Sequence, residues 1–249
     1  MRIILSGFYS RLIFLLFGFL PASLFARQLI PQATIVLPSQ PTPIEEFAGE
    51  ECQRYLYKIT GLTCPRVSET KEPAGYTIHI GQTRANMPHR LTPRSHFDGA
   101  NGFRIVPEDG RLSIIGGDDL GTLYGVYTFL ETQGIRWFSD NNIDEIVPRH
   151  SSIVIPDKEI LEIPDFPIRW VHRDLWALRN KMNVGVSIGD KPVGVRWRYT
   201  FHSFYRLLDS EIYFEDHPEW YALTDGVRKK LEGRSHGWQI CTTNDQVVK

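Results

Sequence analysis

The stretch GFRIVPEDGRLSIIGGDDLGTLYGVYTFLE, residues 102–131, is the part of the sequence that decides the fold. Two runs rich in β-branched residues, 102–106 and 111–115, flank Pro-Glu-Asp-Gly, which is typical of a hairpin turn. Apolar residues then recur at helical spacing until Gly134; they are Leu120, Leu123, Tyr127 and Leu130. The stretch therefore predicts a β-hairpin that leads directly into an amphipathic helix.

A second helix is predicted upstream of this hairpin. Thr42 can cap it, Pro43 fits its first position, and Glu45 completes a capping box before Gly61 ends the pattern. Its apolar face consists of Ile44, Phe47, Ala48, Tyr55, Leu56 and Ile59, so the adjacent acids Glu45/Glu46 and Glu50/Glu51 are expected to be solvated. Strands are predicted at 33–37 and 77–80, with a loop over 84–98.

The remaining pattern predicts two parts. A strand at 135–138 and a closing hairpin of 143–147 with 152–155 complete an α/β accessory domain over residues 30–157, with a mixed sheet and helices packed against it. Pro164 and Pro167 mark a linker. Beyond it we predict a strand at 168–172, a helix at 175–182, a Gly-rich loop at 185–194, a helix at 210–216 capped by Asp209, a strand at 220–223, a turn at 224–226 and a helix from 243.

Composition excludes several classes of function. The 249 residues carry a formal net charge of -1, which gives no field to attract nucleic acid or an acidic membrane surface. The three cysteines, Cys52, Cys64 and Cys241, have no zinc-site spacing, so no metal or cofactor is expected. Cys52 and Cys64 could form a disulfide, or could be two half-buried thiols.

The first 26 residues resemble a secretory signal. Arg2 and Arg11 supply positive charge, residues 12–20 are apolar apart from Gly18, and Ala26 offers a small residue for cleavage. A membrane anchor is the alternative, although the apolar run is shorter than the roughly 20 residues of a span. We expect the signal to be cleaved and the mature protein to be secreted or periplasmic, with no membrane contact thereafter.

The motifs that could carry chemistry have structural explanations. Gly116-Gly-Asp-Asp-Leu-Gly-Thr lies between a strand and a helix, but it lacks a lysine and the nucleotide-binding spacing, so an Asp cap is favoured over a phosphate loop. Glycosidases need two carboxylates about 5–9.5 Å apart. No catalytic pair is assigned, because none of the adjacent acids lies at the end of a barrel strand. These acids are the two glutamate pairs, Asp118/Asp119 and Asp144/Glu145.

Several motifs resemble the N-terminal domain of bacterial alpha-glucuronidases, glycoside hydrolase family 67, which also precedes the barrel of beta-N-acetylhexosaminidases. They are Gly102-Phe-Arg-Ile, the stretch 116–131, Gly134-Ile-Arg-Trp-Phe138 and the helix 51–61, and they cover roughly residues 30–157. The second half resembles a bacterial group in which this domain is attached to a glycosidase-like barrel. The matching segments are 176–183, His202-Ser-Phe204, 213–223, Asp225-Gly226 and Gln239-Ile-Cys241.

The resemblance implies where a sugar would lie. In relatives the strand that matches 134–138 lies near the barrel mouth, which makes Trp137 the first candidate for a sugar contact, followed by His202 and Trp176. Packing and surface charge are the alternative explanation for His202 and the run 196–198. The catalytic acids of the related hydrolases lie on later barrel strands. A barrel takes about 250 residues, whereas 164–249 supplies about 90.

We therefore expect an incomplete (β/α) TIM-type barrel over 164–249 and a chain that is a fragment or a truncated product. Its function would be that of the N-terminal part of an exported glycoside hydrolase-like protein, with a carbohydrate partner containing uronic acid or amino sugar. On its own the chain is expected to show little or no hydrolysis. The alternative is a non-catalytic module that binds carbohydrate or only braces the barrel.

Overall fold

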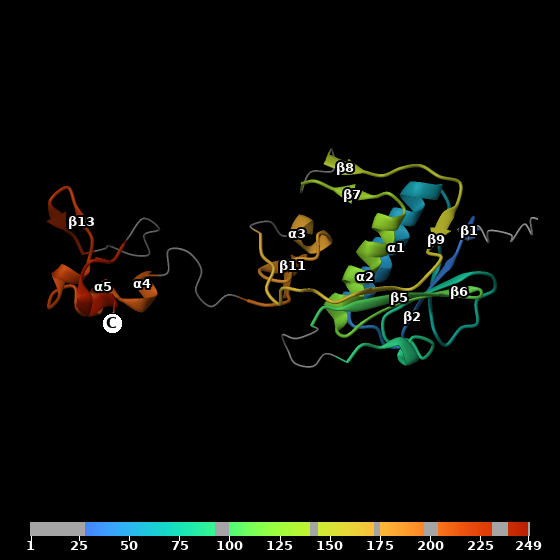
Figure 1. The fold of residues 1–249 in the computed structure, drawn as a ribbon, viewed down its shortest axis with the longest axis horizontal. Coiled ribbons are helices and arrows are strands. Elements are labelled where there is room, and N and C mark those ends of the chain that lie inside the picture. Colours follow the sequence, from blue (N-terminus) through green and yellow to red (C-terminus); the bar gives the residue numbers. More distant parts are fainter. Residues whose placement is uncertain are drawn as a thin grey trace, which may run out of the picture.

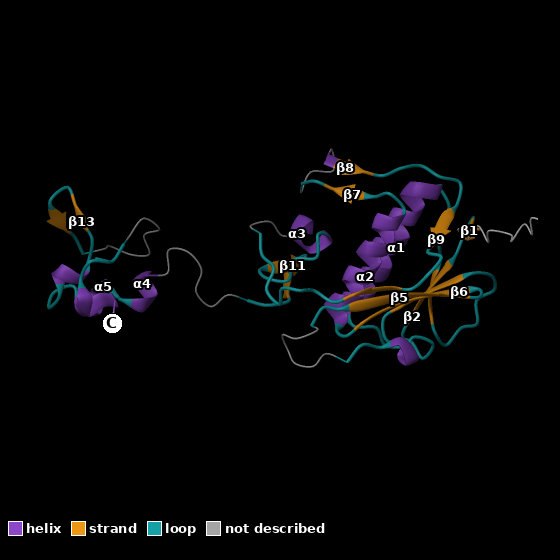
Figure 2. Cartoon of the chain, viewed as in Figure 1, coloured by secondary structure: helices purple, strands orange, loops and turns teal. Residues whose placement is uncertain are grey.

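The computed structural model describes residues 28–92, 100–139, 144–171, 175–196, 204–230 and 239–248. Its centre is a six-stranded mixed sheet in the order β10-β5-β6-β4-β2-β3 (Figures 1 and 2). The strands are β2 (Thr34–Leu37), β3 (Arg66–Ser68), β4 (Thr77–Ile80), β5 (Phe103–Glu108), β6 (Arg111–Gly116) and β10 (Ile160–Glu162). β3, β2, β4 and β6 are parallel to one another, whereas β5 is antiparallel to both of its neighbours, β6 and β10. The predicted α/β fold with a mixed sheet is therefore confirmed.

Helix α1 (Pro43–Thr60) has the predicted ends. The Thr42 side chain accepts from the backbone of Glu45, the Glu45 side chain accepts from the backbone of Thr42, and Gly61 closes the helix at φ +73°. Together these contacts form the predicted capping box. Figure 1 shows α1 beside α2 (Asp119–Thr132) on one face of the sheet, where they bury the apolar residues of β2, β4, β5 and β6.

The predicted hairpin and its helix are also confirmed. β5 and β6 pair around the turn at Gly110, and Asp118 caps α2 through the Gly121 amide, at 2.7 Å. Gly116 ends β6 in very close contact with the first turn of α2. A Cβ added there would lie 2.2 Å from the Thr122 amide nitrogen and 2.4 Å from the Asp118 carbonyl oxygen.

We predict that Gly116→Ala destabilises the protein by about 3 kcal/mol or more, because backbone atoms must shift to admit the methyl group. Gly110→Ala is the matched control: Gly110 has φ +71° with open space around it, so only about 1 kcal/mol of backbone strain is expected. Urea unfolding of the two variants provides the comparison. Equal urea midpoints for the two variants would show that β6 and α2 do not pack tightly against each other at Gly116.

The predicted closing hairpin is wrong. β8 (Glu145–Ile146) pairs with β7 (Arg136–Trp137), and β9 (Ile153–Ile155) pairs with β1 (Gln28–Ile30) at the start of the described chain. Each of the two strands thus finds its partner outside the local pair. Strand β10 lies beyond the predicted domain end at residue 157, so the sheet continues past that boundary, up to the segment just before the predicted linker at Pro164.

The part after the linker consists of short elements. Around α3 (Leu175–Arg179), β11 (Val186–Ile188) pairs with β12 (Lys191–Val193) where a Gly-rich loop was predicted. Residues 168–171 form no strand, so that prediction is wrong for its described part. The later elements are α4 (Phe204–Leu207), α5 (Ser210–Tyr213) capped by Asp209 as predicted, β13 (Leu223–Thr224), β14 (Val227–Arg228) and α6 (Asp245–Val248). Two short 3-10 helices, η1 (Met87–His89) and η3 (Pro218–Trp220), complete the set.

The predicted barrel is not confirmed by the described residues. Between residues 164 and 248, the two described hairpins, β11–β12 and β13–β14, are antiparallel, whereas a TIM barrel is built from parallel strands. No described helix is long and apolar enough to cross a membrane. Cys52 and Cys64 are buried free thiols, and burial raises the pKa of both.

Candidate functional site

Trp137 lies inside the domain, between α1 and α2. Its side chain is 4% exposed and meets the rings of Tyr55 and Tyr127 edge-on, with centroids 5.3 and 5.4 Å away. Its Nε1 donates to the Tyr55 hydroxyl at 2.7 Å, and that hydroxyl donates to Glu145 Oε2 at 2.5 Å. The indole is thus enclosed by side chains of its own chain.

Glu145 also takes a hydrogen bond from Lys58. Burial alone would raise the pKa of Glu145, but the hydrogen bonds from Lys58 and Tyr55 hold it below its ordinary value. The group therefore stays ionised near neutral pH. Such a carboxylate is a poor general acid, because it carries no proton to donate.

Glu51 and Arg179 form a buried ion pair that joins α1 to α3. The Glu51 side chain is 6% exposed and that of Arg179 is 5% exposed. Glu51 Oε2 accepts from Arg179 Nε at 3.2 Å and from the Tyr127 hydroxyl at 3.3 Å, and Oε1 pairs with Arg54 Nη2 at 2.6 Å. Burial acts to lower the pKa of Arg179, but the charge of Glu51 more than offsets it, so the pKa of Arg179 is raised above its ordinary value.

Polar side chains also connect residues 166–196 to α2; we call Asp118, Asn101, Arg169 and Asn183 the seam cluster. Asn101, at φ +64°, donates to Asp118 Oδ2 through its amide and its Nδ2, at 3.0 and 2.9 Å. Its Oδ1 accepts from Arg169 Nη2 and Asn183 Nδ2, at 3.0 and 2.9 Å. Asn183 Oδ1 accepts from the Arg169 amide at 2.9 Å. Asn101, Arg169 and Asn183 are thus each bonded to the other two, and Asp118 is attached to them through Asn101.

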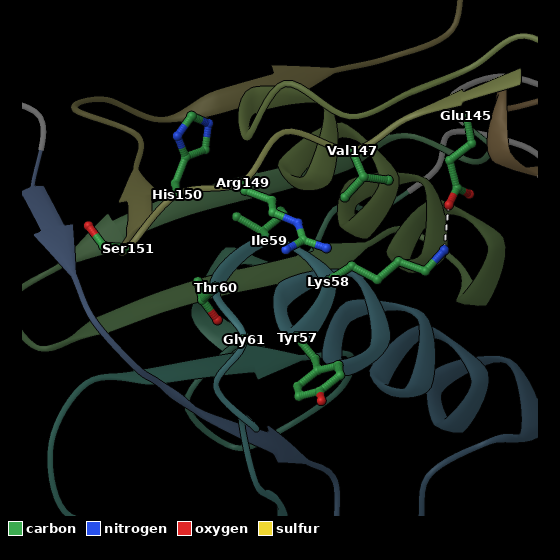
Figure 3. Close-up of a pocket in the computed structure, with 10 residues that line it drawn as sticks. All are labelled: Tyr57, Lys58, Ile59, Thr60, Gly61, Glu145, Val147, Arg149, His150 and Ser151. Atoms are coloured by element: carbon green, nitrogen blue, oxygen red, sulfur yellow. Dashed lines mark hydrogen bonds and ion pairs between the residues drawn. The ribbon is translucent and has the colours of Figure 1, made fainter. Parts of the chain in front are cut away.

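Figure 3 shows an open pocket of about 780 Å³ at the C-terminal end of α1, which we call the Arg149 pocket. Arg149 and Lys58 extend across its centre, while Glu145 lies at one side with its hydrogen bond to Lys58. The exposed His150 adds a third basic group. Three basic side chains suit an anionic group, although they also offset the partial negative charge of the helix end.

A second pocket, of about 470 Å³, lies between α1, α3 and the β11–β12 hairpin; we call it the Arg179 pocket. Its walls combine charged and apolar groups. They are Phe47, Glu50, Glu51, Arg54, Leu175, Arg179, Ser187, Ile188 and Gly189.

A third pocket, of about 640 Å³, opens at the N-terminal ends of α1 and α2, beside the ends of β4 and β6. Open α/β sheets commonly bind ligands at such strand ends. Here the backbone amides that could bind a ligand already donate to carboxylates of the chain itself. Glu45 Oε1 accepts from the Gln82 amide at 2.7 Å, and Asp118 caps α2, which confirms the predicted Asp cap over a phosphate loop.

None of these three pockets presents two uncommitted carboxylates among the described residues. Glu145 is bound by Tyr55 and Lys58, Glu51 by two arginines, and Asp118 by α2 and Asn101. Glu50 and Glu51 are neighbours on a helix, so their side chains point in different directions. The described part of the chain also holds no group of three or more His, Cys, Asp or Glu side chains placed for a metal.

The structure describes two of the three predicted sugar contacts, Trp137 and Trp176. Trp137 is a core residue, a placement that gives no support to sugar stacking on it. Trp176 is half-buried and its Nε1 donates to the Trp137 carbonyl at 2.9 Å, so the two tryptophans are adjacent in space. His202 lies outside the described residues.

Sequence reasoning missed the residues that join the two parts of the chain. Glu51 and Glu45 were predicted to be solvated, and that prediction is wrong, since they are 4% and 2% exposed. Arg179 and Asn183 lie in one of the quoted motifs, 176–183, but no local pattern links them to partners at 51 and 101. The one signal in the sequence was Arg179 itself, because a positive residue on the apolar side of a short helix indicates a buried acidic partner.

A family model described as a domain of unknown function, DUF4838, matches residues 139–249. No curated protein matches the chain significantly. A similar solved structure is a family GH115 4-O-methyl-alpha-glucuronidase with specificity for decorated arabinogalactans. It shares 16% identity at a TM-score of 0.46, over 63% of this chain and 25% of that one.

Two further similar structures are a GH138 enzyme targeting pectin rhamnogalacturonan II and a mutant Streptomyces plicatus beta-hexosaminidase in complex with its product GlcNAc. The first has 18% identity and a TM-score of 0.33, over 42% of this chain and 13% of that one. The second has 11% identity and a TM-score of 0.34, over 57% and 26%. These structural neighbours are carbohydrate-active glycoside hydrolases, and the chain spans about a quarter or less of the length of each.

Proposed function

We propose that the chain is part of an exported, glycoside hydrolase-like protein, in which the α/β domain is non-catalytic and braces the segment that follows it. The proposal includes export directed by residues 1–26, the start of a glycosidase-like barrel after residue 164, and a carbohydrate partner containing uronic acid or amino sugar. The assignment to carbohydrate chemistry rests on the family 67-like motifs at 102–138 and 51–61.

The observation that carries the bracing function is the seam cluster. Buried polar groups fix one arrangement when every member is paired, because any other arrangement leaves donors or acceptors without partners. Asn101 and Asn183 are 5% and 2% exposed, and their side chains bond across 82 positions of sequence. The Tyr124 hydroxyl adds a bond from α2 to the Met182 carbonyl, at 2.7 Å. The domain thereby holds residues 166–196 in a defined position.

The pockets support the non-catalytic part of the proposal. A glycosidase needs one carboxyl group as an acid and a second as a base or nucleophile. In the described residues each buried carboxylate at a pocket is already paired with cations or amides, as expected of groups that maintain structure. The purified chain should not cleave aryl glucuronides or aryl N-acetylglucosaminides, and hydrolysis at an ordinary enzymatic rate would refute this part.

We predict that Asn183→Leu lowers the free energy of unfolding by about 2 to 4 kcal/mol. The change keeps the volume but leaves the Pro167 carbonyl and the Arg169 amide without their partners. Limited proteolysis should then cut residues 164–196 faster than in the unmodified chain. Gln32→Leu is the control: it removes an exposed bond to the Thr63 carbonyl and should cost less than about 0.5 kcal/mol. Unchanged proteolysis in Asn183→Leu would contradict the bracing function.

A further inference from the structure

The six-stranded sheet has a second face, on the side away from α1 and α2. A Cβ added at Gly125 of α2 would lie 2.8 Å from Ile114 Cγ2, so Ile114 of β6 faces that helix. Its neighbours Ser113 and Ile115 point to the other face, because side chains alternate along a strand. Both are nevertheless 0% exposed. Another segment of the chain must therefore cover the second face.

Residues 81–92, which we call the strap, lie over this face. Thr83 Oγ1 lies 3.4 Å from His79 Nδ1 on β4, and His89 Nε2 lies 3.5 Å from Glu108 Oε2 on β5. Because β6 lies between β4 and β5, the strap crosses it. Figure 1 shows the short helix of the strap, η1, in teal-green on the opposite side of the sheet from α1 and α2.

The strap is attached mainly by polar contacts. Its buried side chains are those of Thr83 and Asn86, and both are polar. Asn86 Nδ2 donates to the carbonyls of His79 on β4 and Ile114 on β6, at 3.0 and 3.2 Å. The apolar Met87, in contrast, is 45% exposed. A segment that buries so little apolar surface of its own can open locally while the rest of the domain stays folded.

His79 lies under the strap in surroundings that disfavour a positive charge. Burial lowers the pKa of His79 and the guanidinium of Arg111 lowers it further, whereas Glu69 and Glu108 offset part of this effect. The register partners of His79 on β2 and β6 are uncharged, as is Thr83 of the strap. Below the ordinary histidine pKa of about 6.5, an opened strap therefore lets this ring take up a proton that the closed form disfavours.

We propose that the strap is an acid-sensitive cover, which closes the second face of the sheet at neutral pH and opens at mildly acidic pH, when His79 takes up a proton. Opening uncovers the Ser113 hydroxyl and the apolar side chain of Ile115. The response is reversible, because it depends on one protonation and on no covalent change.

The second histidine of the region, His89, has a smaller influence on the strap. The side chains of His89 and Glu108 are 22% and 30% exposed, and ion pairs at such exposure contribute little. Arg111 already donates to both carboxylate oxygens of Glu108, at 2.9 and 2.8 Å. A charge on the His89 ring therefore adds little to the closed form, whereas a charge on the His79 ring opposes it.

Hydrogen exchange of the full chain, measured from pH 7.5 to pH 5, tests the proposal. The reporters are the Asn86 and His89 amides, which donate to the Thr83 and Asn86 carbonyls at 3.0 and 2.8 Å. After correction for the intrinsic exchange rate at each pH, their opening constant should rise below about pH 6.5, by at most tenfold per pH unit for one proton. Amides of α2 should show no such rise. His79→Gln should remove the rise, and the matched control His89→Gln should keep it.

Four results would overturn the acid-sensitive cover. They are an opening constant that does not change with pH, a rise that persists in His79→Gln, a rise that is lost only in His89→Gln, and an equal rise at the α2 amides, which would indicate global unfolding. If His79→Gln is already open at pH 7.5, NMR titration of the His79 ring in the unmodified chain decides instead. A ring that titrates at its ordinary value of about 6.5 contradicts the proposal, and a lower value supports it.

Discussion

Replacing Glu51 with alanine is expected to lower the free energy of unfolding by about 3 to 5 kcal/mol, because it leaves a buried charge without its partner. Glu51 accepts from Arg179 and Tyr127 and pairs with Arg54, and the side chains of Glu51 and Arg179 are 6% and 5% exposed. Removing the carboxylate leaves the Arg179 guanidinium buried between α1 and α3. Urea unfolding followed by circular dichroism measures the loss.

Glu50→Ala is the matched control, one residue away on the same helix. Its carboxylate is half-exposed and lies 3.4 Å from Arg66, so its loss should cost less than about 1 kcal/mol. The double variant Glu51→Leu with Arg179→Met should recover most of the stability, because buried ion pairs can often be replaced by apolar residues of similar volume. Equal losses in Glu50→Ala and Glu51→Ala would show that the pair is not buried in solution.

Local pattern was enough to predict most of the α/β domain. The capping box at Thr42, the Asp118 cap and the β5–β6 hairpin each depend on residues within a few positions of one another. Such short-range contacts can be predicted from the sequence, because a side chain and the amide that it caps are neighbours along the chain. The elements built on such signals were therefore placed correctly.

Long-range pairing was not predictable in the same way. The strand at 153–155 was matched with its nearest neighbour, whereas it pairs with residues 28–30. Glu51 was assigned to a solvated helix face because its partner Arg179 lies 128 positions later. Periodicity reports which side of one helix is apolar, but it does not report which charged group another element brings to that side.

The predicted sugar contacts depend on a different kind of signal. Trp137 and Trp176 came from motif resemblance, which indicates position in a fold but not exposure. The structure does bring the two together, through the bond from Trp176 Nε1 to the Trp137 carbonyl. It places Trp137 beneath the surface, however, and brings Arg179 to the pocket nearby.

Trp137→Ala is expected to cost about 3 to 5 kcal/mol, the usual range for removing a buried aromatic ring. The cavity would lie between Tyr55 and Tyr127, whose rings now contact the indole at centroid distances of 5.3 and 5.4 Å. Tyr55 would also lose the hydrogen bond from Nε1. Thermal unfolding of the variant measures the effect.

Two further variants decide between a core role and a sugar contact for this tryptophan. Trp137→Phe keeps an aromatic ring but removes the bond to Tyr55, and should cost less than the alanine variant, about 1 to 2 kcal/mol. Tyr57→Ala removes an aromatic side chain that is 54% exposed on the same helix as Tyr55, and should change stability by about 0.5 kcal/mol or less. If Trp137→Ala kept its stability and lost only sugar affinity, the indole would have to be accessible to ligand, contrary to its packing between two tyrosines. Loss of a core residue lowers the free energy of unfolding, whereas loss of a sugar contact lowers only the affinity for sugar. The quantity that falls in Trp137→Ala therefore identifies the role of Trp137.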